Sequence, residues 1–359
     1  ELPGLRLALM ALLLALAANV GVGTMVGSFR ATFTGWLDQR MAAELYLNAE
    51  SPDQAARMQD WLEARVDAVL PVTLVERDLL GQPGRIYGVV DHATYRDHWP
   101  MLEQVPGVWD LLHQGKGVLV NEQAALRSGL ALGDPFALPG GALPVIGVYS
   151  DYGNPEPQAI LGIAAFQARF HEAKALRIAL RLPPEGVAAL SAELMRTFEL
   201  PPDAISDQAT IKAFSLQVFE RTFAVTGALN VLTLAVAAVA LLASLLTLSG
   251  LRLPGLAPVW ALGLTQGRLA GLEFARSVVL ALLTAVLALP LGLMLAWVLL
   301  AVVNVEAFGW RLPMQVFPMD LVWLFGMALA TGTLAAAWPA VQLYRRRPAD
   351  LLRVFANAR

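Results

Sequence analysis

Four long apolar runs divide the chain, and the rest of the sequence is arranged around them. The first lies between Arg6 and Arg30, and the others cover residues 222–251, 277–305 and 321–344. None of the four contains a charged side chain. Each exceeds about 20 residues, the length that a helix needs to cross about 30 Å of hydrocarbon. The pattern therefore predicts four transmembrane helices.

The first run can also be compared with a secretory signal peptide. A signal peptide has a shorter apolar core followed by a small-residue cleavage site, which Ala17-Ala18-Asn19 imitates. The apolar character nevertheless continues to Phe29, so a spanning helix is favoured. The glycines at 21, 23 and 27 suit close helix packing in lipid.

The polar part of the chain lies between the first two runs, at about 31–217. It holds most of the acidic residues and all four histidines, and it is long enough for a domain with its own core. An alternating segment at 43–49 predicts a strand, and Ser51, Pro52 and Gln54 predict the capped start of a helix that runs to about Asp67. Segments 72–80 and 85–90 alternate like two strands of a hairpin, so this part is predicted to be β-α-β-β.

The remainder of the polar part also alternates between strand and helix. Asn121 is expected to cap a short helix that Gly129 ends. We interpret the whole as an α+β domain whose β-α-β units flank an inserted subdomain at about 95–170. Strands are predicted at 117–121, 143–149 and 176–182, and helices at 93–105, 122–128, 160–170 and 187–198.

The segment Ile211–Arg221 is amphipathic and runs into the second apolar run without a helix breaker. We therefore expect one long helix that leaves the membrane and enters the polar domain. Pro290 is expected to kink or loosen the third span. The loop at 304–319 carries several aromatic side chains, including Trp310, which suit a membrane interface.

Composition agrees with a membrane protein and excludes several functions. The chain is 57% hydrophobic and 15% charged, whereas soluble domains are about 25% charged. A net charge of −3 argues against a nucleic-acid partner, and the lack of cysteine excludes disulfides, thiol catalysis and Cys-ligated metals. The chain begins with Glu1, which we interpret as the result of processing, of trimming, or of its being a piece of a longer protein.

Motifs for catalysis are not found in the sequence. It lacks the G-x-x-x-x-G-K-[S/T] and H-E-x-x-H motifs, so ATP hydrolysis and zinc proteolysis by this chain are not expected. His92, His98, His113 and His171 have no metal-ligand spacing, and we interpret them as structural. The spans carry no charge of the kind that ion-driven pumps keep there, which argues against a secondary transporter. We therefore expect a non-catalytic chain that holds no cofactor or metal of its own.

Basic residues at the ends of the runs predict the orientation. The segment 252–276 and the C-terminal tail are rich in arginine, whereas the loop at 304–319 has only Arg311, balanced by Glu306. The segment and the tail are therefore placed in the cytoplasm, and the large domain and the loop on the opposite side. The expected cytoplasmic anchors are Arg252, Arg268, Arg276, Arg345, Arg346 and Arg347.

Four sets of residues carry a resemblance to a known family. They are Gly117–Asp134 in the polar domain, Trp260–Gly263 with Glu273 after it, Pro290–Gly292, and Pro339–Ala340 with Tyr344–Arg353. In this order, with one span before the domain and three after it, they resemble the FtsX-like permeases of ABC transporters, which include MacB and the lipoprotein-releasing permeases. Some members of that family are twice as long as this chain, which would then be the C-terminal half of a two-repeat permease.

The resemblance implies a membrane α-helical fold with an α+β extracytoplasmic domain inserted between helix 1 and helix 2. It also implies a cytoplasmic ATPase dimer, using ATP and magnesium, and a second permease half or copy. The expected ATPase contact consists of Pro258, Val259, Trp260, Ala261, Leu262 and Gly263. The expected parts are helix 1 at 1–30, the domain at 31–217, helix 2 at 218–251, a coupling segment at 252–276, helix 3 at 277–303, an external loop at 304–319, helix 4 at 320–344 and a basic tail at 345–359.

The coupling segment departs from the family pattern. It has fewer charges after the second span, and Pro254 and Pro258 are expected to shorten or bend it. Trp260 is equally explained as an interfacial anchor, and the terminal arginines as a topology signal that contacts lipid headgroups.

Two functions from different classes are compatible with the resemblance. One is export or extraction of a lipid, lipoprotein or hydrophobic molecule at the bacterial inner membrane. The other is transmembrane signalling that regulates an extracytoplasmic cell-wall hydrolase by the same motion. An extracytoplasmic effector or acceptor protein would be a further partner in either case. An inert anchor would need one span, so the three spans after the domain argue against it.

Overall fold

The computed structural model describes residues 3–261 and 265–345. The chain divides into two compact units, one helical and one built on a sheet. The helical unit comprises Glu1–Phe29, Glu220–Val302 and Pro313–Arg359. The sheet unit comprises Arg30–Phe219 together with Val303–Leu312.

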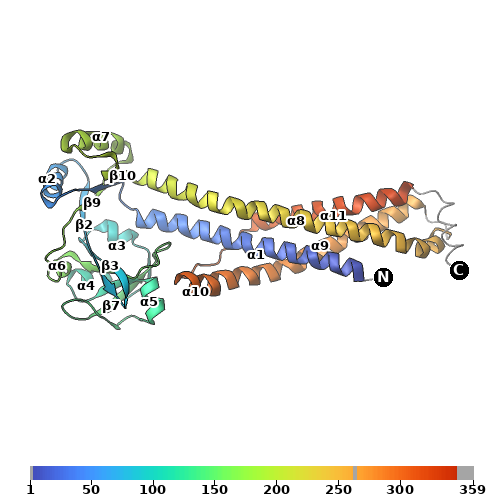
Figure 1. Ribbon diagram of the computed structural model, residues 1–359, viewed down its shortest axis with the longest axis horizontal. Coiled ribbons are helices and arrows are strands. Elements are labelled where there is room, and N and C mark those ends of the chain that lie inside the picture. The colour runs from blue at the N-terminus through green and yellow to red at the C-terminus, as the bar shows by residue number, and fades with distance from the viewer. Residues whose placement is uncertain (1–2, 262–264, 346–359) are drawn as a thin grey trace. The chain divides into compact units, whose positions relative to one another are not determined.

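Four long helices account for the predicted spans. They are α1 (Pro3–Arg40), α8 (Gln208–Ala261), α9 (Gln266–Val298) and α11 (Pro318–Arg345), labelled in Figure 1. Within the described residues, four stretches of these helices are long and apolar enough to cross a membrane, which confirms the prediction. A π-helical turn at Leu299–Val303 (η3) leads from α9 into the short helix α10 (Asn304–Phe308).

Small residues bring the spanning helices close together. The core of the helical unit is rich in alanine and draws on all four long helices, with Leu16, Leu234, Ala285 and Ala335 as examples. A Cβ atom placed on Gly292 of α9 would lie 2.4 Å from the Cβ of Val20 of α1, so only glycine fits there. Such contacts replace the hydrophobic effect as the source of packing energy in lipid.

The glycines of the first span have different surroundings. A Cβ atom on Gly21 would lie 2.8 Å from Leu295, and one on Gly27 would lie 2.8 Å from Phe317. Gly23 has no atom within 4 Å of that position, so close packing does not explain it. Asn19 adds an interhelical hydrogen bond, because its Nδ2 donates to Oγ1 of Thr233 at 3.0 Å.

In the described residues, the predicted coupling segment at 252–276 is largely helical. Helix α8 continues through Pro254 and Pro258 to Ala261, and α9 begins at Gln266 and continues through Pro290. Pro254 and Pro258, expected to shorten or bend this helix, do not end it before Ala261, and the bend remains a prediction. A proline removes one intrahelical hydrogen bond, whereas leaving the helix in or near lipid would expose several backbone groups.

The sheet unit is built on one continuous sheet. Its order in the described residues is β10-β1-β9-β2-β3-β8-β5-β7-β4, with β6 paired to β7 off this path. The pairs β3–β8 and β5–β7 are parallel, and the other pairs are antiparallel. The strands are β1 (Leu45–Asn48), β2 (Ala68–Leu79), β3 (Gln82–Val89), β4 (Met101–Gln104), β5 (Val118–Asn121), β6 (Pro135–Phe136), β7 (Leu143–Tyr149), β8 (Gln158–Gly162), β9 (Arg177–Arg181) and β10 (Ile205–Asp207).

Short helices cover this sheet and close three hydrophobic cores. One core includes Met58 of α2 and Leu194 of α7, a second includes Ala124 of α5 and Phe166 of α6, and a third includes Tyr95 of α3 and Leu112 of α4. These helices are α2 (Pro52–Leu62), α3 (Ala93–His98), α4 (Val108–His113), α5 (Glu122–Ser128), α6 (Ile163–Gln167) and α7 (Val187–Phe198), with 3-10 turns at Pro184–Gly186 (η1) and Pro202–Ala204 (η2).

Two predicted helix caps are confirmed. The Oγ of Ser51 accepts a hydrogen bond from the Gln54 amide at 3.2 Å, and Pro52 is the first residue of α2. The Oδ1 of Asn121 accepts from the Ala124 amide at 3.2 Å, and Gly129 ends α5 with a φ of 63°. Both caps depend on residues within a few positions of each other, which is why the sequence alone reveals them.

Other predicted elements in this domain need correction. The helix expected at 93–105 ends at His98, because Trp99 precedes a proline and is extended, and Met101–Gln104 instead forms edge strand β4. The helix expected at 160–170 starts at Ile163, since 158–162 is the fully buried strand β8. The helix expected to reach Asp67 ends at Leu62.

Strands β4 to β8, which lie within the predicted inserted subdomain at about 95–170, extend the sheet of the rest of the domain or pair with it, and do not form a sheet of their own. Strand β8 lies beside β3 in parallel register, with Tyr87 opposite Ile160. Strands β4, β5 and β7 then extend the same sheet. A short apolar run cannot be assigned to strand or helix by periodicity alone, so this pairing is not visible in the sequence.

Candidate functional site

The residues predicted to contact an ATPase lie at the end of α8. Pro258, Val259, Trp260 and Ala261 belong to the final turns of that helix. Leu262 and Gly263 lie outside the described residues. The next helix is capped by Thr265, whose Oγ1 accepts a hydrogen bond from the Arg268 amide at 3.4 Å.

Four of the predicted cytoplasmic anchors, Arg252, Arg268, Arg276 and Arg345, lie in described helices. Arg268 and Arg276 lie near the start of α9 and are exposed, and Arg276 forms an ion pair of 3.8 Å with Glu273. A Cβ atom on Gly267 of α9 would lie 3.6 Å from the ring of Tyr344, so the end of α11 lies beside the start of α9. Arg252 lies within α8, Arg345 ends α11, and Arg346 and Arg347 lie outside the described residues.

Helices α1 and α8 are bound to each other within the sheet unit. The rings of Phe33 and Phe219 stack with centroids 6.0 Å apart. Lys212 of α8 forms an ion pair of 2.6 Å with Asp38 of α1, and the side-chain amide of Gln208 donates to the Met41 carbonyl. We call this pair of helix segments, residues 30–40 and 208–219, the stalk.

The stalk is attached to the sheet at two places. Strand β10 pairs with β1 and passes directly into α8, where Oδ1 of Asp207 accepts from the Thr210 amide at 2.7 Å. This hydrogen bonding lowers the pKa of Asp207. On α1, Nε1 of Trp36 donates to the Ser150 carbonyl at 3.0 Å. Both stalk helices are therefore attached directly to the sheet unit.

The segment between the third and fourth spans also belongs to the sheet unit. The backbone amide of Arg311 donates to Oε1 of Glu122 at 3.0 Å. The ring of Trp310 lies edge-on to Tyr152 at 6.4 Å, and the Nδ2 of Asn304 donates to the Trp310 carbonyl at 2.8 Å. This segment and the large domain therefore lie on the same side of the membrane, which agrees with the predicted topology.

Glu122 is the most perturbed acid in this contact. Burial raises the pKa of its carboxyl to about 7, and the hydrogen bond from the Arg311 amide partly opposes that rise. The other carboxyl oxygen, Oε2, is buried and has no hydrogen-bond partner among the described residues. Sequence reasoning identifies Glu122 only as the first residue of a capped helix.

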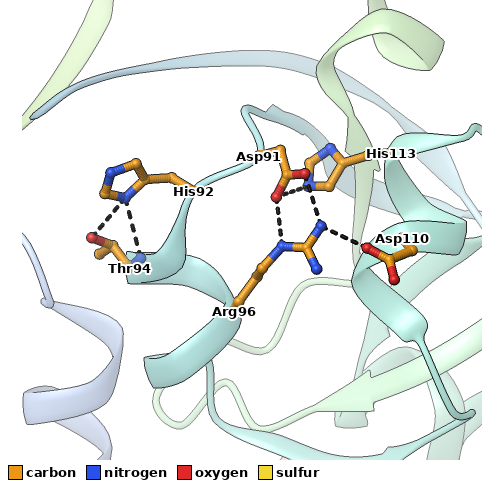
Figure 2. Close-up of polar contacts among 6 residues, drawn as sticks. All are labelled: Asp91, His92, Thr94, Arg96, Asp110 and His113. Atoms are coloured by element: carbon orange, nitrogen blue, oxygen red, sulfur yellow. Dashed lines mark hydrogen bonds and ion pairs between the residues drawn. The ribbon is translucent and has the colours of Figure 1, made fainter.

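A polar cluster on α3 and α4 contains one of the four histidines (Figure 2). The guanidinium of Arg96 contacts Oδ1 of Asp91 at 2.6 Å and Oδ1 of Asp110 at 2.8 Å. Hydrogen bonding to Arg96 lowers the pKa of Asp91. His113 Nε2 lies 3.6 Å from Asp91, and burial lowers the pKa of its imidazole. The arrangement joins two helices through exposed charges.

The remaining histidines show no common site. His92 caps α3, because its Nδ1 accepts from the Thr94 amide at 3.1 Å (Figure 2). His98 is exposed at the end of α3, and His171 is exposed in a turn before β9. Within residues 3–261 and 265–345, no group of three His, Cys, Asp or Glu side chains could hold a metal ion.

Comparison with known protein families gives two matches that together cover most of the chain. Residues 6–198 match the MacB-like periplasmic core domain, and residues 227–348 match the FtsX-like permease C-terminal domain. Among curated proteins, an uncharacterized ABC transporter permease protein of Mycobacterium tuberculosis is 27% identical over 364 residues. The match covers 94% of this chain, which spans 42% of the length of that relative.

Solved structures of extracytoplasmic domains are similar at lower identity. The periplasmic region of MacB from Actinobacillus actinomycetemcomitans is 13% identical with a TM-score of 0.35, covering 48% of this chain and 91% of that one. The extracellular domain of the noncanonic ABC-type transporter YknZ from Gram-positive bacteria is 11% identical with a TM-score of 0.32, covering 46% and 98%. These scores are low, so the family assignment depends on the two family matches.

Proposed function

This chain belongs to the FtsX-like permease family and carries a MacB-like periplasmic core domain, and from that premise we propose that it transmits the work of a separate ATPase to its extracytoplasmic domain. It is a membrane protein whose sheet unit lies on the extracytoplasmic side. In the proposal it is one permease half, paired with a second half or copy. A cytoplasmic ATPase dimer, which binds ATP and magnesium, supplies the energy.

The observation that carries the proposal is the continuity of α8. This helix has 54 residues, which corresponds to a length of about 80 Å at about 1.5 Å per residue. A membrane core of about 30 Å uses less than half of that length. One helix therefore contains both the segment proposed to contact the ATPase, near Pro258, and the residues that follow strand β10.

The proposed motion begins at the turn between α8 and α9. Closure of the ATPase dimer displaces residues 258–263, and a continuous helix passes that displacement to its other end. The stalk contacts Phe33–Phe219 and Asp38–Lys212 make α1 move with α8. The attachment of the stalk to β1, β10 and the Ser150 carbonyl then moves the sheet.

The proposed substrate is a lipid, a lipoprotein or another hydrophobic molecule handled on the extracytoplasmic side. The spans carry no charged side chain between their ends, and their shared core is made of alanine and leucine. A polar solute that crossed between them would lose its hydration without compensation. Handling of an apolar cargo outside the membrane avoids that cost.

Co-purification tests this function. The full-length protein, expressed with a candidate ABC-type ATPase and placed in nanodiscs, is expected to retain that ATPase. Leu262→Glu should abolish that retention, because a carboxylate would be buried in the proposed contact. Leu102→Glu is the matched control, since Leu102 is exposed on β4 in the sheet unit. Equal retention by the parent and Leu262→Glu would contradict the proposed contact.

A further inference from the structure

A cavity of about 300 Å³ lies within the sheet unit, where the last turn of α1 meets the sheet. Four strands contribute to its wall, namely β1, β2, β3 and β9, together with helix α3. Arg40 and Met41 close one side, and Ile211 of α8 also contributes. The volume is at the lower end of the range for small-molecule sites.

Aromatic side chains form much of the wall. Tyr46, Tyr87, Tyr95 and Trp99 all line the cavity. Two of them carry buried hydrogen-bond donors that have no partner among the described residues, namely the Tyr95 hydroxyl and Nε1 of Trp99. Burial raises the pKa of Tyr95, so its hydroxyl stays protonated and able to donate. A buried donor without a partner destabilises the unliganded protein, and a ligand with an acceptor atom would remove that cost.

The charge of the wall is entirely positive. Arg40 and Arg177 line the cavity, and the lining contains no Asp or Glu. The guanidinium of Arg40 lies 4.3 Å from the ring centre of Trp99, a cation–π contact. Neither arginine forms an ion pair with a carboxylate in the described part of the chain.

Acidic residues near this wall are already paired with other cations. Glu44 accepts from Nε of Arg181 at 3.0 Å, and Asp38 pairs with Lys212 at 2.6 Å. The two arginines of the cavity therefore lack a local counter-charge. Two uncompensated cations beside an apolar surface favour a ligand that brings its own negative charge.

We propose that this cavity binds a small amphipathic anion. Its carboxylate or phosphate group is bound by Arg40 and Arg177, and its apolar body contacts Tyr46, Tyr87 and Trp99. The unpaired donors of Tyr95 and Trp99 bind further oxygen atoms of the ligand. The site does not depend on the proposed ATPase coupling, although a ligand there would contact residues of both stalk helices, Arg40 and Ile211.

Titration of the full chain in nanodiscs tests the site, with empty nanodiscs as the blank. The probes are octanoate, octyl phosphate, octylamine and octanol, which share one chain length and differ in the head group. Both anions should bind saturably, and octylamine should bind at least about tenfold more weakly. If octyl phosphate binds more tightly than octanoate, the natural ligand is expected to carry a phosphate, and if octanoate binds more tightly, a carboxylate. Either result supports the proposal.

Two substitutions distinguish a charged site from simple partition into an apolar cavity. Arg177→Gln should weaken the binding of octanoate about tenfold, because it removes one of the two cations proposed to bind the carboxylate. Arg177 is exposed, so the substitution does not disturb the core. Tyr95→Phe removes only the unpaired hydroxyl, so it should weaken octanoate while leaving the thermal stability of the unliganded protein unchanged or raised.

Arg65→Gln is the matched control for these variants. Arg65 also stacks on a tryptophan, with its guanidinium 4.1 Å from the Trp61 ring, but it does not line the cavity. Its octanoate affinity should equal that of the parent. Three results would overturn the proposal: no saturable binding of either anion, octylamine binding as tightly as octanoate, or an unchanged affinity in Arg177→Gln.

Discussion

The backbone amide of Arg311 donates a hydrogen bond of 3.0 Å to Oε1 of Glu122, from a position 189 residues further along the chain. The contact joins the segment between the last two spans to the first turn of α5. It compensates only one oxygen of a carboxyl that is 5% exposed. The protonation state of Glu122 should therefore affect how firmly this segment is held.

Stability should depend on pH through Glu122. Its pKa is raised from the usual 4.5 to about 7, so the folded protein binds more protons than the unfolded chain between those values. The contribution of Glu122 to the free energy of unfolding is therefore most favourable at low pH and falls as the pH rises from about 4.5 to about 7. Glu122→Gln, which cannot ionise, should be more stable than the parent at pH 8 by an amount on the order of 1 kcal/mol.

Thermal unfolding in nanodiscs measures this effect at about pH 5 and about pH 8. These two values lie on either side of the titration of Glu122. The difference between Glu122→Gln and the parent should be small at the lower pH and large at the higher. Glu103→Gln serves as the control, because Glu103 is exposed on β4. A difference that does not change with pH would show that Glu122 does not titrate in this range.

Packing of the spans should be sensitive to a single methyl group at Gly292. Gly292→Ala places a Cβ atom 2.4 Å from the Cβ of Val20, and α1 and α9 must separate to accommodate it. Overpacking of this kind costs about 1–3 kcal/mol. Gly271→Ala on the same helix has no atom within 4 Å of the new methyl group. It should be neutral or stabilising, because alanine favours helix.

The melting temperatures of these two variants in nanodiscs check the packing. Gly292→Ala should melt below the parent and Gly271→Ala should not. Equal melting temperatures for the two variants would mean that α1 and α9 do not pack at Gly292.

The Arg96 cluster should contribute little to stability. Arg96 and its partners Asp91 and Asp110 have exposed side chains, so water and salt screen their ion pairs (Figure 2). Arg96→Gln should therefore lower stability only slightly, and the loss should shrink at high salt. Denaturation at low and high ionic strength measures it. A larger loss that is independent of salt would indicate that Arg96 acts through packing.

Features of this protein that depend on residues close together in the chain can be predicted from the sequence, whereas features that depend on distant residues cannot. The spans follow from uninterrupted apolar runs, and the caps at Ser51 and Asn121 from neighbouring residues. Strand β8 is not predictable in this way, because its identity comes from pairing with β3, which is distant in sequence. The same holds for Glu122, whose pKa is raised by a fold that buries it.

The candidate cavity is likewise not predictable. Its wall combines the last turn of α1 with four strands, and the sheet order that brings them together is not consecutive. The predicted ATPase contact is different, because it rests on the family resemblance of residues 258–263 and remains a prediction. The structure adds that α8 extends unbroken through the first four of these residues to Ala261.

The most direct test of the proposed mechanism concerns the continuity of α8. Three glycines inserted after Phe219, where the sheet unit ends, should uncouple the two ends of the helix without altering either. The same insertion after Gly81, in the turn between β2 and β3, is the control, since Gly81 has a φ of 78° and lies at an exposed position. Hydrogen exchange of residues 205–212 is measured in the assembled complex with and without a non-hydrolysable ATP analogue. Nucleotide should change this exchange in the parent and the control but not in the Phe219 insertion. An equal change in the Phe219 insertion, or no change in the parent, would contradict transmission through α8.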